Sequence, residues 1–416
     1  MDSILLSQLI YTLGEVKTDC EITLVTSDSR AVEQNSVFLA IKGERVNGQD
    51  YASQAVKNGA RLVISEDFIP DVPTDLLLIV ANILDASIVM GKNFRDKYPL
   101  QTIGITGSVG KTTTKDFVYT ALSPFAKTVR SMGNQNNELG MPQTIYGFKD
   151  DDKFAILEMG MANFNDVHKL SLAARPHGAI ITCIGVSHLQ QMKTQENILK
   201  AKLEICDGMD EDGILVLNGD DKFLSKVKVD KPQNVYWFAI ENQEADVVAK
   251  GIKQDNFSTH FDIWDKKFGV LPCTIPTVGT HNVMNALSAY TLISRMGFDA
   301  GQTADNLKNY QPSGMRQKPV EKDGILYIED CYNASPDSMH AAVNVLSKVA
   351  KGRKIAVLGD MLELGEQSEK MHTEVGVYAK NMGVDLLLCT GEQAKFICDG
   401  FGENALFFNS KSQVAQ

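Results

Sequence analysis

A glycine-rich segment near residue 110 has the residue types and the spacing of a phosphate-binding loop. It reads Thr106-Gly107-Ser108-Val109-Gly110-Lys111-Thr112-Thr113 and lies between a strand-like run and a helical stretch. Glycines let backbone N–H groups approach phosphate oxygens, and the helix N-terminus adds the positive end of its dipole. Lys111 can supply a cation to the β- and γ-phosphates of a nucleotide, and the Thr112 hydroxyl can bind Mg²⁺. We therefore predict nucleotide binding by residues 107–113.

The match to the strict phosphate-loop motif fails at one position, because Ile105 stands where that motif has glycine. A glycine-rich turn without a ligand is the alternative interpretation. The preceding strand, the following helix and the intact Gly-Lys-Thr-Thr-Thr-Lys run favour nucleotide binding. The loop by itself fits a switch, a pump or a ligase.

Polar residues also follow two apolar, strand-like runs of the same region. Glu158 comes directly after the run 154–157, and His188 follows the run 178–182. Ligand groups gather at the carboxyl ends of strands in open α/β sheets, and a carboxylate there can hold Mg²⁺. Glu158 could instead interact with a helix dipole, and His188 could be an ordinary polar residue because Mg²⁺ prefers oxygen ligands.

The elements that must position these residues are those of an α/β protein. Continuous apolar runs at 102–106, 154–157 and 178–182 are separated by helical stretches. Such runs predict a parallel sheet that is covered by helices on both faces. Shorter strand-like runs before this region, and further runs after it at 325–328, 354–358, 386–389 and 406–408, predict two more α/β units.

Two segments mark the boundaries between these units, a charged one at 95–99 and a Pro- and Gly-containing one at 310–314. We therefore expect three domains, at residues 1–97, 98–312 and 313–416. The length of 416 residues accommodates them at roughly 100–200 residues per domain.

The composition excludes several classes of protein. Hydrophobic residues make up 44% and charged residues 22%, which is an ordinary globular balance. The net charge of −11 disfavours general binding to nucleic acid or to anionic membranes. The seven cysteines are scattered without a Cys-x-x-Cys pair, the N-terminus does not resemble a signal peptide, and no apolar run approaches the roughly 20 residues that span a bilayer. We expect a cytoplasmic monomer without a nucleic-acid partner or a membrane span.

Eight further segments stand in a fixed order along the chain, at residues 26–30, 133–137, 158–160, 184–189, 200–204, 279–286, 332–339 and 358–365. Together with the phosphate loop they resemble the Mur ligase family, the ATP-dependent amide-forming enzymes of peptidoglycan precursor synthesis. The resemblance covers nearly the whole chain. It implies a smaller N-terminal α/β domain that binds a UDP-sugar, a central P-loop ATPase-like domain and a Rossmann-like C-terminal α/β domain.

The segments 332–339 and 358–365 resemble those of the members that join D-alanyl-D-alanine to UDP-N-acetylmuramoyl-tripeptide. The implied reaction uses ATP to phosphorylate the terminal carboxylate of the tripeptide. The amine of the dipeptide then attacks the acyl phosphate, and phosphate leaves. The resemblance also implies two Mg²⁺ ions.

The resemblance assigns roles to several residues around the nucleotide. His188 would help hold a second Mg²⁺, and Lys202 would be carbamylated by CO₂ and become an oxygen ligand. Without the resemblance, Lys202 has the pattern of a solvated helix face. Lys111 and Arg316 would neutralise phosphate charge, with Arg316 reaching the γ-phosphate when the third domain closes. The resemblance also places an adenine site at Asn282 and Asn285. It identifies Asp330 as the acid of the third domain that meets the nucleotide.

The implied substrate contacts lie in the two outer domains. Ser29 and Arg30 match positions that hold the uridine nucleotide, and Arg suits a phosphate contact. Asn47 and Gly48 belong to an Asn-Gly-Gln-Asp run where the family usually has Asp-Gly-His-Asp. Near the incoming dipeptide the resemblance places Asn333 and Ser335, the latter where family members commonly carry Asn.

Three alternatives stay open at this point. A sister ligase that adds the third amino acid shares most of the motifs, although the segments 332–339 and 358–365 argue against it. A folate-polyglutamate ligase shares the central loop but not the uridine motif at Ser29 and Arg30. A P-loop switch or binding module would use only the nucleotide site.

The resemblance also raises an expectation about the C-terminus. Related enzymes continue through another helix and a strand with a Lys-Gly-Ser segment, which does not occur after residue 390 here. We therefore expect a shortened third domain that is the least stable part, with an unpaired sheet edge and partial exposure of Phe407 or Phe408.

Overall fold

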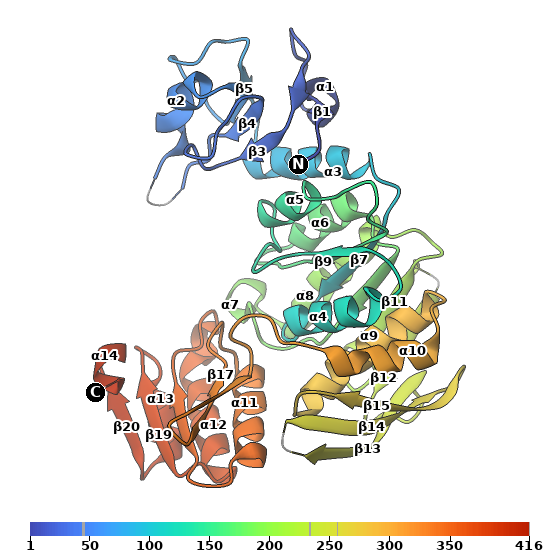
Figure 1. Cartoon of the computed structure of the whole chain (residues 1–416). Helices are drawn as coiled ribbons and strands as arrows, with labels where there is room; N and C mark the ends of the chain where they lie inside the picture. Colours follow the sequence, from blue (N-terminus) through green and yellow to red (C-terminus); the bar gives the residue numbers. More distant parts are fainter. Residues whose placement is uncertain (44–45, 233, 256, 416) are drawn as a thin grey trace.

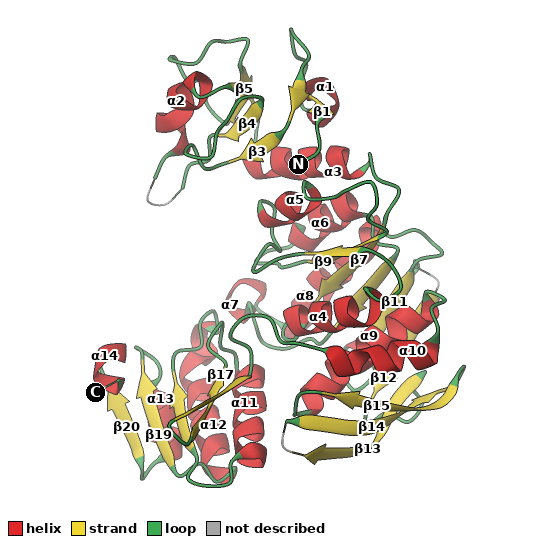
Figure 2. Ribbon diagram, in the orientation of Figure 1, coloured by secondary structure: helices red, strands yellow, loops and turns green. Residues whose placement is uncertain are grey.

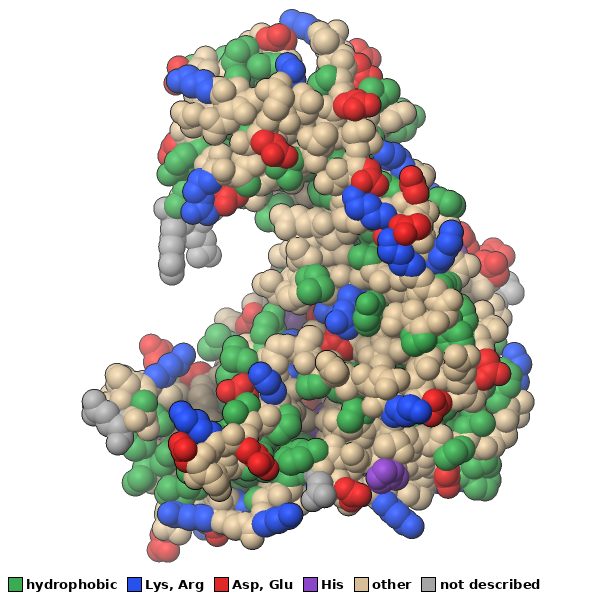
Figure 3. Space-filling model, viewed as in Figure 1, with side chains coloured by type: hydrophobic (Ala, Val, Ile, Leu, Met, Phe, Trp, Pro, Cys, Tyr) green, Lys and Arg blue, Asp and Glu red, His purple; other side chains and the backbone are tan. Residues whose placement is uncertain are grey.

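The structure is a computed structural model that describes residues 1–43, 46–232, 234–255 and 257–415. Three groups of strands follow one another along the chain, and Figure 1 shows them arranged around an opening. The N-terminal group lies at the top of the view, the central group at the right and the C-terminal group at the lower left. Figure 3 shows that side chains leave a deep hollow between the outer groups.

The N-terminal part contains a four-stranded parallel sheet in the order β3-β4-β5-β6 and a small antiparallel pair. Its elements are β1 (Ile4–Leu5), α1 (Leu6–Leu9), β2 (Glu21–Ile22), β3 (Leu24–Thr26), β4 (Ser36–Leu39), η1 (Gly48–Tyr51), α2 (Ala52–Lys57), β5 (Ala60–Ser65), β6 (Leu77–Ile79) and α3 (Ile83–Arg95). Helix α3 links this part to the next, because Phe94 packs edge-on against Tyr146 and shares one apolar core with it.

The central part is built on a nine-stranded sheet in the order β15-β14-β13-β12-β11-β10-β7-β9-β8. Its first half contains β7 (Gln101–Thr106), α4 (Lys111–Leu122), β8 (Thr128–Arg130), α5 (Gly140–Ile145), β9 (Phe154–Glu158), α6 (Asp166–Ala174), β10 (Gly178–Ile181), α7 (Leu189–Met192), α8 (Gln195–Leu203), η2 (Glu204–Gly208) and β11 (Ile214–Asn218). The predicted parallel sheet is confirmed for these strands.

Helices cover both faces of this sheet, as predicted, and the strand side chains alternate between two cores. Ile180 joins the core that contains α4 and α9, whereas its neighbours Ala179 and Ile181 join the core with α3, α5 and α6. This alternation follows from the two-residue period of a strand. Figure 2 shows the sheet sandwiched between the two groups of helices.

The sequence did not reveal that the sheet continues into an antiparallel portion. This portion pairs β13 with β14 and β14 with β15. The remaining central elements are η3 (Leu224–Lys226), β12 (Asn234–Ala239), β13 (Val247–Asp255), β14 (Ser258–Asp265), β15 (Gly269–Ile275), α9 (Thr280–Arg295), α10 (Ala300–Asn306) and η4 (Leu307–Asn309). The buried Asp265 of β14 pairs with Arg295 of α9 at 2.9 Å and fastens this extension to the helical layer.

The C-terminal part has a three-stranded parallel sheet in the order β18-β19-β20. The predicted strand at 325–328 does not join it but forms a separate antiparallel pair with β16. The elements are β16 (Lys318–Lys322), β17 (Ile325–Glu329), α11 (Pro336–Val349), β18 (Ile355–Leu358), η5 (Gly365–Gln367), α12 (Ser368–Asn381), β19 (Leu386–Thr390), α13 (Lys395–Phe401), β20 (Ala405–Phe408) and α14 (Lys411–Val414). Phe407 is 41% exposed, and among the described residues β20 pairs with β19 alone.

The connector between the central and C-terminal parts is anchored on α4, the helix that opens at Lys111. Tyr310 stacks on Phe117 with ring centroids 3.8 Å apart. Asp116, which is 1% exposed, accepts hydrogen bonds from Ser313 and, at 2.9 Å, from Arg130. The segment between the two parts is therefore tied to the phosphate-loop helix. Among the described helices, none has the length and apolar character of a membrane span.

Candidate active site

The predicted phosphate loop follows β7 and opens α4, as its sequence indicated. Gly107 and Gly110 have φ angles of 148° and 87°, which only glycine adopts readily. A Cβ atom on Gly110 would lie 2.7 Å from Asn285 Oδ1, so the packing also requires glycine there. Ile105 lies fully buried within β7. The strict motif fails at this position because the residue still belongs to the strand and its core.

Lys111 bends back over its own loop, and its Nζ donates a hydrogen bond of 2.8 Å to the carbonyl oxygen of Gly107. The enclosed position lowers the pKa of Lys111, and Glu158 opposes this effect through its negative charge. The amine makes no ion pair within 4 Å in the described part of the chain. The amine can therefore exchange its single loop contact for a phosphate.

Glu158 stands at the end of β9 and is 2% exposed. One of its oxygens accepts a 2.8 Å hydrogen bond from Thr112 Oγ1, and the other accepts one of 2.9 Å from Asn136 Nδ2. Lys115 Nζ lies 3.6 Å from the same carboxylate. The structure thus brings together Thr112 and Glu158, which were predicted to bind metal. Sequence reasoning missed Asn136 and Lys115, although Asn136 lies in one of the ordered motifs.

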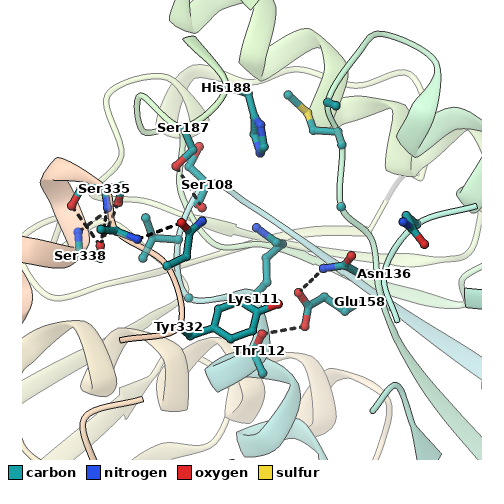
Figure 4. A pocket seen from close by; sticks show the side chains of 18 of the residues that line it. Ser108, Lys111, Thr112, Asn136, Glu158, Ser187, His188, Tyr332, Ser335 and Ser338 are labelled. Atoms are coloured by element: carbon teal, nitrogen blue, oxygen red, sulfur yellow. Dashed lines mark hydrogen bonds between the residues drawn. The ribbon is translucent and has the colours of Figure 1, made fainter. Parts of the chain in front are cut away.

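A cavity of about 400 Å³ opens beside these groups and is shared between two parts of the chain. Figure 4 shows it with Lys111, Thr112 and Glu158 on one side and the C-terminal residues Ser335 and Ser338 on another. The predicted site residues that line it are Ser108, Val109, Gly110, Lys111, Thr112, Glu158, His188, Arg316, Asn333 and Ser335. Gly107 and Thr113 belong to the same loop but do not line the cavity.

His188 reaches this cavity from the loop after β10, with a left-handed backbone at φ 64°. Figure 4 shows its ring pointing toward the Lys111 amine. Burial lowers the pKa of His188, and the negative charge of Glu363 opposes that shift. Glu363 Oε2 lies 2.6 Å from His188 Nδ1, so a C-terminal residue contacts this imidazole directly.

Lys202 does not lie on a solvated helix face, which its sequence pattern had favoured. Its side chain is 1% exposed, whereas Lys200 on the same helix points into solvent. The pKa of Lys202 is lowered to about 7, mainly by burial and in smaller part by the positive charge of Lys111. In the described residues no carboxylate lies within 4 Å of its amine. A buried lysine of this kind has a substantial neutral fraction near neutral pH, and the neutral amine can act as a nucleophile.

The two asparagines predicted to bind adenine are 5% and 8% exposed and do not line the cavity. Asn282 Nδ2 donates to Val278 O at 2.8 Å and to Gln317 Oε1 at 3.1 Å. Asn285 Oδ1 accepts a hydrogen bond of 3.2 Å from Thr114. Asn282 Nδ2 and Asn285 Oδ1 are therefore engaged in internal hydrogen bonds, and contact of the two residues with adenine stays a prediction.

Two charged residues come from the segment after the connector. The Arg316 guanidinium lies over the Tyr332 ring at 4.3 Å and lines the cavity. Burial raises the pKa of Asp330, and the charge of Arg316 opposes that shift. Asp330 itself does not line the cavity. Gln317 was not anticipated, yet its Oε1 lies 2.9 Å from His281 Nε2 and joins the connector to α9.

The predicted uridine-binding residues lie in the N-terminal part, away from this cavity. Arg30 is exposed and pairs with Asp28 through two hydrogen bonds of 2.9 and 2.8 Å, while Ser29 lies between them. Asn47 Oδ1 accepts a hydrogen bond of 3.2 Å from the Gln49 N–H. A Cβ atom on Gly48 would lie 2.7 Å from Ile41 O, so this glycine has a packing reason of its own.

Ser335, where the family commonly has Asn, caps helix α11. Its Oγ accepts from the Ser338 N–H at 3.3 Å, and the Ser338 Oγ accepts from the Ser335 N–H at 2.9 Å. This reciprocal pair is a capping box, and it orients the first turn of the helix toward the cavity. Asn333 is exposed at the cavity wall, where its Oδ1 accepts a 2.9 Å hydrogen bond from the Ala334 N–H.

Comparison with known proteins agrees with this geometry along the chain. Three family models match: the Mur ligase family catalytic domain at residues 21–92, the Mur ligase middle domain at 105–293, and the Mur ligase glutamate ligase domain at 315–416. The UDP-N-acetylmuramoyl-tripeptide–D-alanyl-D-alanine ligase of Bacillus subtilis is 35% identical over 379 residues, which cover 90% of this chain and 81% of that protein.

Solved structures agree as well. MurF from Acinetobacter baumannii superposes with a TM-score of 0.91 at 28% identity, covering all of this chain and 91% of that one. MurF ligase from Thermotoga maritima, in complex with ADP, gives a TM-score of 0.84 at 26% identity, covering 94% of this chain and 89% of that one. The likeness in sequence extends over most of both chains, and the chain belongs to the Mur ligase family.

Proposed function

We propose that this chain is an ATP-dependent ligase that joins D-alanyl-D-alanine to the terminal carboxylate of UDP-N-acetylmuramoyl-tripeptide. The relative from Bacillus subtilis carries this activity in its name. The observation that carries the proposal is the shared cavity. A phosphate loop with a buried carboxylate forms one wall, and Arg316, Asn333 and Ser335 of the C-terminal part form the other. Phosphoryl transfer and amide formation take place on the same carboxyl group, so the groups on both walls must reach one position.

The residues around the cavity suit a reaction through an acyl phosphate. The γ-phosphoryl group of ATP passes to the tripeptide carboxylate and ADP is released. The dipeptide amine then attacks the acyl carbon, loses a proton and expels phosphate. Lys111 and Arg316 neutralise the charge on the transferring group, and the backbone N–H groups of residues 107–112 hold the nucleotide. Catalysis by this chain is therefore mainly positioning of reactants and stabilisation of charge.

The donor set beside the phosphate loop fits Mg²⁺. Glu158 offers a buried carboxylate, Thr112 a hydroxyl at 2.8 Å from it, and both are oxygen donors, which Mg²⁺ prefers. When bound, the ion would polarise phosphoryl oxygens and offset their negative charge. We assign a second ion to the neighbourhood of His188 and Lys202, in line with the resemblance.

An unmodified Lys202 does not fit a Mg²⁺ site, because its ammonium form carries no lone pair and its amine form offers nitrogen where Mg²⁺ prefers oxygen. A neutral amine can attack the carbon of CO₂, forming an N–C bond and releasing a proton, and the resulting carbamate offers oxygen ligands. The burial that brings the pKa of Lys202 to about 7 supplies this neutral amine. We therefore propose that Lys202 is carbamylated in the active enzyme.

We further propose the domains and contacts that the resemblance implies. The domains are residues 1–97, 98–312 and 313–416. Ser29, Arg30, Asn47 and Gly48 hold the UDP-sugar, and Asn282, Asn285 and Asp330 approach the nucleotide after the parts rearrange. Domain closure of this kind is common in enzymes that must exclude water. The seven cysteines are all unpaired, which fits a reducing compartment such as the cytoplasm.

A phosphate-release assay tests the proposal. It contains the purified chain, ATP, Mg²⁺, UDP-N-acetylmuramoyl-tripeptide and D-alanyl-D-alanine, and each component is omitted in turn. We expect release only when both the acceptor and the dipeptide are present. Release with a single amino acid and the corresponding UDP-dipeptide would indicate the sister ligase. Hydrolysis that needs neither substrate would indicate a nucleotide switch.

A further inference from the structure

The segment 358–365 of the C-terminal part contacts the central part beside the active-site cavity. Glu363 Oε2 lies 2.6 Å from His188 Nδ1, and Glu363 O accepts a 3.0 Å hydrogen bond from the Gln190 N–H. The backbone of Gly365 packs against the same glutamine, and Val186 packs on the C-terminal core. One short segment of each part thus forms an interface whose centre is the contact between Glu363 and His188.

Hydrogen bonds within the C-terminal part fix the segment that forms its side of this interface. Asp360 accepts hydrogen bonds of 2.8, 2.9 and 2.7 Å from the N–H groups of Glu392, Gln393 and Ala394. The Met361 N–H donates to Nε2 of the fully buried His372 at 3.0 Å. These bonds fix the chain just before Glu363. The position of the Glu363 carboxylate is therefore a property of the docked C-terminal part and not of a free loop.

The two residues at the centre meet in an uncommon way, because both have left-handed backbones. The φ angles are 64° at His188 and 63° at Glu363, and neither residue is glycine. Residues other than glycine take this conformation at a cost, which surrounding structure must offset. His188 Nδ1 is shielded from solvent and has no partner in full hydrogen-bond geometry among the described residues. The Glu363 carboxylate faces it as an ion-pair partner at 2.6 Å.

We propose that Glu363 is a positioning residue that holds the His188 imidazole in the tautomer with the proton on Nδ1, leaving the Nε2 lone pair for the active-site cavity. A carboxylate 2.6 Å from Nδ1 favours a proton on that nitrogen. Histidines that bind metals almost always offer their second ring nitrogen to a carboxylate or carbonyl in this manner. Docking of the C-terminal part therefore prepares His188 as a ligand.

This role concerns orientation and not overall stability. The Glu363 side chain is 46% exposed, and ion pairs at such positions contribute little to the free energy of unfolding. The consequence for metal binding rests on the proposed function of His188. It links the contact of segment 358–365 with the central part to completion of the second metal site.

The first test observes the tautomer in the full chain without metal. Ring ¹⁵N spectra are recorded about two pH units above the ordinary His pKa of about 6.5, and His188→Gln assigns the resonances. We expect the Nδ1–H form in the wild type and loss of that preference in Glu363→Ala. Glu366→Ala is the matched control, a neighbouring exposed glutamate without an ion pair in the described residues, and it should match the wild type. An Nε2–H form in the wild type, or equal spectra for wild type and Glu363→Ala, would overturn the inference.

The second test follows the Mg²⁺ concentration that gives half-maximal ligation. Removing such a supporting carboxylate typically costs 10- to 100-fold in metal affinity or activity, and we expect a rise of roughly that size for Glu363→Ala. Glu366→Ala should show none. An unchanged Mg²⁺ requirement in Glu363→Ala would contradict the link to the metal site. Absence of ligation in the wild type would defeat the proposed function instead and leave the tautomer comparison intact.

Discussion

The Thr112 hydroxyl donates a 2.8 Å hydrogen bond to Glu158, and this contact joins the first turn of the phosphate-loop helix to the end of the adjacent strand. Both side chains are at most 7% exposed. Each group is a hard oxygen donor, and the carboxylate brings the negative charge that a divalent cation needs. The pair is the best-defined candidate for the Mg²⁺ that accompanies ATP.

We expect Glu158→Gln to lower kcat by about 100-fold or more, because the amide removes the charge but keeps the shape. The matched control is Glu138→Gln, which changes a carboxylate of the same cavity that makes no hydrogen bond or ion pair in the described residues. Steady-state ligation at several Mg²⁺ concentrations measures both. Equal losses in the two variants would count against a specific metal role for Glu158.

Lys111→Ala should abolish measurable ligation, with a fall on the order of 10²–10³-fold or more in kcat. The Lys111 amine makes one hydrogen bond, to its own loop, so the fold should persist. Thermal unfolding and phosphate release, measured on the same preparation, separate the two effects. A folded variant with substantial ligase activity would remove Lys111 from the mechanism.

Lys202→Ala should be nearly inactive and partly rescued by added acetate or formate, because a small carboxylate can replace the oxygens of a carbamate. The matched control is Lys200→Ala, two residues away on the same helix but exposed, and it should be close to wild type. Rescue is measured as phosphate release against carboxylate concentration. Wild-type turnover in Lys202→Ala would show that the buried amine has only a packing role.

The Asp265–Arg295 pair gives a pH-dependent stability prediction. Burial raises the pKa of Asp265, but the hydrogen bonds from Arg295, the Lys267 N–H and Tyr290, together with the charge of Arg295, outweigh it, and the net pKa is lower than the ordinary value of 3.8. Since the folded pKa is depressed, the stabilisation is present above the unfolded pKa and is lost as pH falls through the folded pKa. Asp265→Asn should therefore lose about 3–5 kcal/mol near pH 7, as expected for a broken buried pair.

Urea unfolding at pH 7 and again below the ordinary Asp pKa tests this expectation. The difference between wild type and Asp265→Asn should shrink at the lower pH. Asp262→Asn on the same strand is a suitable control, since Asp262 makes no ion pair in the described residues. A difference that is the same at both pH values would mean that the charge of Asp265 is not what stabilises the pair.

The sequence indicated the parts of the site that depend on local pattern. The phosphate loop was identified by its glycines, which lie between a strand and a helix. Glu158 follows a buried strand, and this position placed it at the carboxyl edge of the sheet, where ligands gather. The buried state of Lys202 was different, because its neighbours Lys200 and Glu204 have the composition of a solvated face. Only the packing of helix α8 against the rest of the central part buries it.

Residues that act across parts of the chain were the hardest to foresee. Glu363 lies in a recognised segment, yet its contact with His188 depends on how the C-terminal part docks. Asn282 and Asn285 have amide groups that suit adenine, but the fold uses both for internal hydrogen bonds. The antiparallel strands β13 to β15 also escaped notice, because alternating half-buried strands carry a weaker signal than continuous apolar ones.

The most direct test of the proposed function is identification of the product. The chain is incubated with ATP, Mg²⁺, UDP-N-acetylmuramoyl-tripeptide and D-alanyl-D-alanine, and the UDP-linked species are analysed by mass spectrometry. The account predicts a new species heavier than the acceptor by the dipeptide less one water, formed together with ADP and phosphate. ATP consumption without that species, or addition of a single amino acid in place of the dipeptide, would contradict it.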